Sequence, residues 1–179
     1  RGGPIRGPLH GVPVGIKEII DIAGEVTTCH SKIFLKNVAT EDAEVINRLR
    51  AAGAIPFGKL SLHEFAIGGP SFDLPFPPAR NPWNVNHHPG GSSSGSGWAP
   101  AAGLCFASLG SDTGGSIRFP STMNGLSGLK PTWGRVSRAG VFPLAESLDH
   151  VGPMCRSALD VALVLGVIAG ADPDDPTAA

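Results

Sequence analysis

The stretch GGSSSGSGWAPAAGLCFASLGSDTGGSIR, residues 90–118, holds the strongest local signals for the fold of this chain. Residues 90–97 are only glycine and serine, which is the composition of a flexible linker between domains. They lead directly into the small residues 98–103, which can form a tightly packed helix, and then into the apolar residues 104–109, which favour a strand. Because a linker does not need such packing partners, we expect the Gly/Ser tract to belong to a folded core.

The predicted strand ends in a second run of small residues, from Gly110 to Arg118. Glycines in such a run let the backbone turn sharply and approach a ligand closely. Consecutive backbone N–H groups at a turn of this kind can also bind an anion. We therefore expect a ligand to approach the chain here.

Residues 9–17 predict a second strand, because residues 12, 14 and 16 are apolar at alternate positions. Pro8, just before this segment, and Pro13 within it indicate either the edge of a sheet or an approach through a loop. The strand would end in Lys17. A lysine at this point is ordinarily solvated, but burial would lower its pKa and make it a general base that could activate a serine without a histidine.

Further along, a helix is predicted over residues 41–52, capped by Thr40 and ended by Gly53. A short buried strand is predicted over residues 54–57. A helix that runs directly into a strand is typical of α/β layer architectures.

The last predicted helix spans residues 159–169 and ends at Gly170. Ser157 and Asp160 have the spacing of a capping box at its start. The helix is almost wholly apolar, so we expect it to be buried on most sides by a sheet or by other helices.

Composition excludes several classes of partner. The chain has 179 residues, with 25 glycines and 17 prolines, only 16% charged residues and a net charge of -1. Together with a pI of about 6.6, this charge balance provides no electrostatic footprint for nucleic acid. No run of 18 apolar residues predicts a membrane span. The start, residues 1–4, has neither an initiator Met nor a signal peptide, so we expect a longer parent chain.

The cysteines and histidines predict no metal site or disulfide framework. Cys29, Cys105 and Cys155 are odd in number and far apart, so we interpret them as reduced, buried side chains in a cytoplasmic protein. The pair His87–His88 has no accompanying set of metal ligands.

Two other functions remain open from the residues alone. Residues 91–95 fit G-x-S-x-G, which would make Ser93 the nucleophile of an α/β-hydrolase, with Asp112 or Asp149 and then His150 in the right chain order. Such a nucleophile must follow a buried strand directly, however, and residues 81–90 do not read as one. The other alternative is a binding module without catalysis.

Four segments, in this order, carry a resemblance that covers nearly the whole chain. They are residues 11–17, 90–96, 110–118 and 125–137, and the spacing from Ser92 to Ser116 fits as well. Together they resemble the amidase signature family. The resemblance implies that Ser116 is the nucleophile, that Lys17 is the base, and that Ser92, after a cis peptide bond, bridges the two.

The resemblance also implies how the reaction is supported. The N–H groups of the turn would form the oxyanion hole, namely those of Thr113, Gly114, Gly115 and Ser116. Ser93 resembles a position that hydrogen-bonds near the bridging serine. Independently of the resemblance, the opposite charges of Asp112 and Arg118 on either side of the turn could hold the loop rigid, and the alternative is a surface ion pair of little energetic value. No metal or organic cofactor is expected.

As a member of this family, the chain would have a mixed, twisted α/β sheet flanked by helices. Residues 1–179 would form the central part of one amidase signature domain, with both ends missing. The implied activity is hydrolysis of a small-molecule carboxylic amide to an acid plus ammonia or an amine. The alternative within the family is the A subunit of glutamyl-tRNA(Gln) amidotransferase. Accordingly, the partners would be copies of the same chain or amidotransferase subunits, with no direct contact to nucleic acid or membrane.

Overall fold

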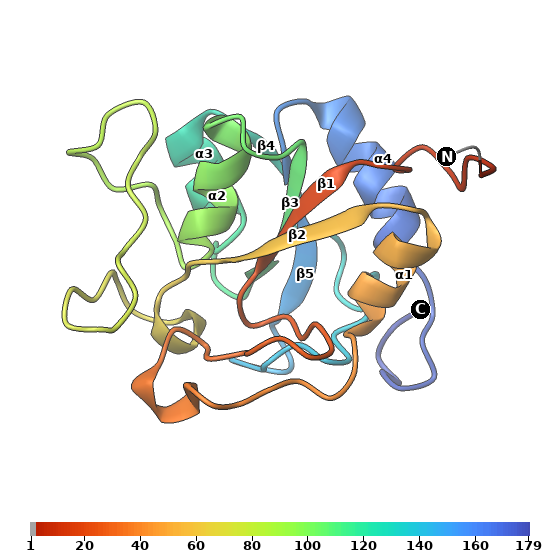
Figure 1. Cartoon of the computed structure of the whole chain (residues 1–179), viewed down its shortest axis with the longest axis horizontal. Helices are drawn as coiled ribbons and strands as arrows, with labels where there is room; N and C mark the ends of the chain where they lie inside the picture. Colours follow the sequence, from red (N-terminus) through yellow and green to blue (C-terminus); the bar gives the residue numbers. More distant parts are fainter. Residues whose placement is uncertain (1–2) are drawn as a thin grey trace.

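The computed structural model describes residues 3–179, so Arg1 and Gly2, at the start discussed above, lie outside the described residues. A five-stranded sheet with the order β2-β1-β3-β5-β4 forms its centre (Figure 1). The strands are β1 (Pro13–Lys17), β2 (Ile55–Leu60), β3 (Ala107–Asp112), β4 (Ser127–Gly128) and β5 (His150–Cys155). β1 pairs in parallel with β2 and β3, whereas β5 runs antiparallel to β3 and β4. The predicted mixed α/β sheet is therefore confirmed.

Four helices flank this sheet: α1 (Glu44–Ala51), α2 (Ser94–Ala101), α3 (Arg118–Asn124) and α4 (Ala158–Ile168). Two short 3-10 turns span Lys32–Phe34 and Glu64–Ala66. Figure 1 shows α1 and α4 on one side of the strands and α2 and α3 on the other. In residues 3–179, no helix combines the length and the apolar character that crossing a membrane requires.

The alternation of side chains along β1 divides the core from the polar side of the sheet. Val14 and Ile16 are fully buried in the main hydrophobic cluster, together with side chains of α1 and α4. Since successive side chains of a strand point to opposite faces, Lys17 is directed away from that cluster, and its Nζ contacts Ser92 just before α2. The pattern that buries β1 thus also delivers its lysine to the α2 side.

The Gly/Ser tract is packed structure rather than a linker. Ser92 to Gly97 are all buried, and Ser94 opens α2. Pro100 lies inside this helix and has no N–H to give to the carbonyl of Ser96 four residues earlier. The hydroxyl of Ser108 on β3 donates to that carbonyl instead, at 2.6 Å, and so ties α2 to the sheet.

Three predictions about the strands need correction. β1 has a partner on each side, so it is not a sheet edge, and Pro13 is the first residue of this strand. β2 is one of the two edge strands, and its Ile55 and Phe57 are exposed rather than buried. The strand predicted over residues 104–109 lies instead at Ala107–Asp112. It extends through Ser111 and Asp112 because their polar side chains are buried with hydrogen-bond partners.

The helix starts and exposures also differ in part from expectation. Thr40 does not cap α1; the N–H groups of Ala43 and Glu44 donate to the carbonyls of Asp21 and Ala139 instead, so contacts with distant loops replace the cap. The capping box of α4 is confirmed, because Ser157 accepts from the N–H of Asp160 at 3.2 Å. The prediction that α4 is buried on most sides is wrong, because Leu159 on this helix is 70% exposed. All three cysteines are free and buried.

The packing of α1 provides a test of the core. Ile46 is fully buried against the sheet, whereas its neighbour Asn47 is exposed. In the purified protein that contains this chain, Ile46→Ala should lower the free energy of unfolding by about 2–5 kcal/mol, because it leaves a cavity. Asn47→Ala, the matched control on the same helix, should change it by less than about 0.5 kcal/mol. Equal losses in chemical denaturation would contradict this account of the core.

Candidate active site

Lys17 is the centre of the candidate site. Its side chain is completely buried, and its Nζ donates hydrogen bonds to Ser92 Oγ at 2.9 Å and to Ser111 Oγ at 2.8 Å. Burial lowers the pKa of Lys17 from 10.5 to about 7, although the negative charges of Asp112 and Asp149 act in the opposite direction. The alternative of a solvated lysine is therefore wrong, and a large fraction of Lys17 is neutral near pH 7.

The segment before α2 brings Ser92 to this lysine. The peptide bond between Gly91 and Ser92 is cis, as the resemblance implies. The carbonyl of Ser92 accepts from the N–H groups of His63 at 3.0 Å and Ser94 at 2.9 Å. A side chain at Gly91 would collide with the ring of His63, whose Nδ1 would lie only 2.8 Å from an added Cβ. Glycine at this position therefore lets the histidine pack directly on the backbone beside Ser92.

The turn after β3 is organised by the buried carboxylate of Asp112. Its oxygens accept hydrogen bonds from the N–H groups of Gly115, Ile117 and Arg118 at 2.8, 3.1 and 3.2 Å. The Arg118 side chain adds two more, at 3.0 and 3.1 Å. Burial alone would raise the pKa of Asp112, but these hydrogen bonds outweigh it and hold the pKa below its usual value. Since Arg118 is half exposed, the backbone N–H groups rather than the ion pair do most to fix the turn.

Ser116 and Ser92 line the same pocket, a cavity of about 340 Å³ that is also lined by Thr113 and Gly114. Within residues 3–179, the Ser116 hydroxyl makes no hydrogen bond of its own. The structure therefore brings Lys17 and Ser92 into contact and places Ser116 in the lining of the same pocket as Ser92, with no Ser92–Ser116 hydrogen bond in the described residues. Catalytic hydrogen bonds are often long before substrate binds.

The same turn presents free backbone donors to this pocket. Of its four N–H groups, that of Gly115 already donates to Asp112. The N–H groups of Thr113, Gly114 and Ser116 have no acceptor within the described part of the chain. Within the described residues, three of the four N–H groups predicted for the oxyanion hole thus have no acceptor, and that of Gly115 has one.

Ser93 is buried completely and is bound to the sheet rather than exposed. Its hydroxyl donates to the carbonyl of Ser111 at 3.1 Å and accepts from the N–H of Ser111 at 3.3 Å. It follows a segment without a strand, and in residues 3–179 no hydrogen bond links it to His150. This geometry does not form the nucleophile arrangement of an α/β-hydrolase, and Ser93 instead holds the chain around Ser92 against β3.

Two polar residues of the site were not singled out from the sequence. Ser111 is the second partner of Lys17, and the parallel pairing of Ile16 with Leu109 is the signal that places it there. His63 lines the pocket with Ser92, and its Nε2 is buried without a hydrogen-bond partner in the described residues. In contrast, Trp98 and residues 76–80 line a separate groove that contains neither Ser92 nor Ser116.

Comparisons with known proteins agree with this geometry. The protein-family model described as Amidase matches residues 1–179. The A subunit of glutamyl-tRNA(Gln) amidotransferase from Roseiflexus sp. (strain RS-1) is 53% identical over 170 residues, which are 95% of this chain and 35% of that protein. A Mycobacterium tuberculosis (strain ATCC 25618 / H37Rv) protein named as an amidase, AmiD, is 54% identical over 175 residues, 98% of this chain and 36% of that protein.

Solved structures show the same fold. The A subunit of glutamyl-tRNA(Gln) amidotransferase from Thermotoga maritima matches 98% of this chain and 39% of its own, with a TM-score of 0.93 and 43% identity. The native peptide amidase from Stenotrophomonas maltophilia matches 97% of this chain and 36% of its own, with a TM-score of 0.88 and 42% identity. This chain thus spans little more than a third of each of these relatives. The family model and the fold together show that the chain belongs to the amidase signature family.

Proposed function

We propose that the protein hydrolyses a carboxylic amide to an acid plus ammonia or an amine, with Ser116 as nucleophile and Ser92 and Lys17 as proton relay. The observation that carries this proposal is the fully buried Lys17, bonded to Ser92 at 2.9 Å in a site that Ser116 also lines. A base with a pKa near 7 is well matched to proton transfer at neutral pH.

The proposed acylation moves protons along this chain of groups. Neutral Lys17 accepts the proton of Ser92 while Ser92 accepts that of Ser116, and the Ser116 oxygen attacks the amide carbon. In the neutral amine, one N–H of Lys17 stays on Ser111 while the lone pair accepts from the Ser92 hydroxyl, which reverses the direction of the Lys17–Ser92 hydrogen bond described above. The N–H groups of Thr113, Gly114 and Ser116 stabilise the negative oxygen of the tetrahedral intermediate.

Collapse of that intermediate breaks the bond between carbon and nitrogen. The relay returns a proton to the leaving nitrogen, so an amine or ammonia departs and the acyl group stays on Ser116. Water, deprotonated by the same relay, then releases the acid. In this proposal Asp112, Arg118 and Ser93 keep the turn and the Ser92 segment in position throughout.

A second candidate is the glutaminase part of an amidotransferase. Relatives more than 50% identical include both an A subunit of glutamyl-tRNA(Gln) amidotransferase and a protein named as an amidase. Both readings use the same serine chemistry, and they differ in substrate and in the partner that receives ammonia. Release of ammonia from free glutamine that rises severalfold on addition of amidotransferase subunits would favour this candidate, whereas hydrolysis of simple amides by the protein alone would favour the stand-alone amidase. Cytoplasmic location remains a prediction.

Covalent labelling tests which serine is the nucleophile. A fluorophosphonate should form its adduct on Ser116, and peptide mass spectrometry should locate it there. Ser116→Ala should lose the adduct and lower kcat at least about a thousandfold, because the acyl-enzyme cannot form. Ser157→Ala, at an exposed position, should keep both. An adduct on Ser93 would contradict the assignment, and unchanged turnover in Ser116→Ala would leave a binding module as the better reading.

The rate of hydrolysis should depend on the protonation of Lys17. Because only the neutral amine accepts a proton and its pKa is lowered to about 7, kcat/KM should fall about tenfold for each pH unit below 7 and level off above it. Lys17→Met should abolish this acidic limb of the pH–rate profile, the fall in kcat/KM below pH 7, together with most of the activity. Lys36→Met, at an exposed lysine, should preserve both. A limb centred near pH 10 would show that Lys17 keeps the pKa of a lysine in water and would contradict a neutral base at pH 7.

A further inference from the structure

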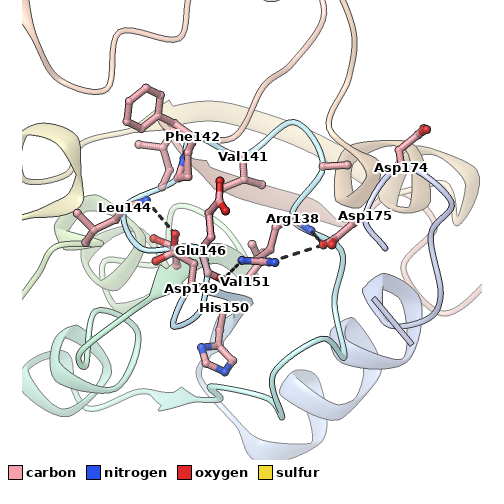
Figure 2. A pocket seen from close by; sticks show the side chains of 14 residues that line it. Arg138, Val141, Phe142, Leu144, Glu146, Asp149, His150, Val151, Asp174 and Asp175 are labelled. Atoms are coloured by element: carbon pink, nitrogen blue, oxygen red, sulfur yellow. Dashed lines mark hydrogen bonds and ion pairs between the residues drawn. The ribbon is translucent and has the colours of Figure 1, made fainter. Parts of the chain in front are cut away.

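Asp149 lies outside the substrate pocket yet is bound to its wall. It immediately precedes β5, and its side chain is nearly buried. One carboxylate oxygen accepts from the hydroxyl of Thr113 at 2.5 Å. The other accepts from the N–H of Leu144 at 2.8 Å (Figure 2) and from the N–H of Ala145 at 2.9 Å. A single carboxylate therefore closes the loop of residues 144–149 and ties it to Thr113.

Thr113 is the first residue of the turn whose N–H groups face the pocket. The middle of that turn is already fixed from the other side, where Asp112 holds the N–H of Gly115 at 2.8 Å. Asp149 supplies the second fixed point, on the Thr113 side chain. Donors that stabilise a developing charge act most strongly when they are oriented in advance and need not reorganise.

The carboxylate of Asp149 also acts on the base. A cavity of about 230 Å³ is lined by Asp149 (Figure 2) and also by Ser111, the partner of Lys17. The negative charge of Asp149, like that of Asp112, raises the pKa of Lys17 against the larger effect of burial. The other titratable groups around Asp149 are His150 beside it and, around this cavity, Arg138, Glu146, Asp174 and Asp175.

We propose that Asp149 is a positioning residue for the amide-hydrolysing site: its hydrogen bond to Thr113 orients the oxyanion turn, and its negative charge lines the same cavity as Ser111, the partner of Lys17. The inference rests on the proposed function. It gives Asp149 a role in orienting the turn that follows β3, which is separate from proton transfer through Lys17, Ser92 and Ser116. It also predicts that the two effects can be separated, because Thr113 carries the hydrogen bond and Asp149 carries the charge.

The hydroxyl is tested with a matched pair of variants in the full-length protein. Thr113→Val keeps the shape of the side chain but cannot donate to Asp149, so kcat should fall about 10- to 100-fold with little change in KM, less than or comparable to the loss of one oxyanion donor. Thr113→Ser keeps the hydroxyl and should recover kcat to within about threefold of the wild type. Thermal unfolding of each variant shows whether it is folded.

The charge is tested with Asp149→Asn and a pH–rate profile. Removal of the negative charge should move the acidic limb to lower pH, because the pKa of Lys17 falls further, whereas Thr113→Val should leave the limb in place. A role confined to folding would lower activity without moving the limb. If Asp149→Asn does not fold, the Thr113 pair decides the proposal alone.

Each outcome has one meaning. Equal kcat in Thr113→Val and the wild type, or an equal loss in Thr113→Ser and Thr113→Val, would overturn the positioning role even though the wild type hydrolyses amides. A wild-type protein that neither hydrolyses amides nor reacts with a fluorophosphonate at Ser116 would instead overturn the proposed function.

Discussion

The candidate site depends on one lysine that is held away from water between two hydroxyl groups. Lys17 is fully buried and bonded to Ser92 and Ser111. Lowering its pKa from 10.5 to about 7 corresponds to on the order of 5 kcal/mol of destabilisation of the protonated form in the folded state. This contribution is absent above the unfolded-state pKa, grows as the pH falls towards 7, and is complete below it. The rest of the fold must supply that free energy, and it does so with a densely packed sheet around the lysine.

The sheet accomplishes this through the order of its strands. β1 lies between β2 and β3, so that Val14 and Ile16 enter the apolar cluster with α1 and α4 while Lys17 contacts the segment before α2. Two carboxylates, those of Asp112 and Asp149, limit how far burial lowers the pKa of Lys17, and both bind the turn after β3. Asp112 binds backbone N–H groups within the turn, and Asp149 reaches it from a loop that arrives more than thirty residues later. The same packing thus fixes the backbone of the turn and lowers the pKa of Lys17.

Local patterns in the sequence revealed the parts of this arrangement that depend on short-range structure. The alternation that ends in Lys17 predicted β1, the Ser157–Asp160 spacing predicted the start of α4, and the motifs around Ser92 and Ser116 indicated the family. The start of α1 could not be predicted in this way, because carbonyls from distant loops replace the expected Thr40 cap. Likewise, the exposure of β2 follows from its place at the sheet edge, and the contacts of Ser111 and Asp149 follow from strand pairing and a long-range loop, none of which leaves a local pattern.

The most direct test of this account is the ionisation of Lys17 itself. Selective isotope labelling of lysine, with the Lys17 signal assigned by its loss in Lys17→Met, allows its side-chain NMR shift to be followed as pH changes. The account predicts a midpoint near pH 7. A midpoint near 10.4, the ordinary value for a lysine in water, would contradict it.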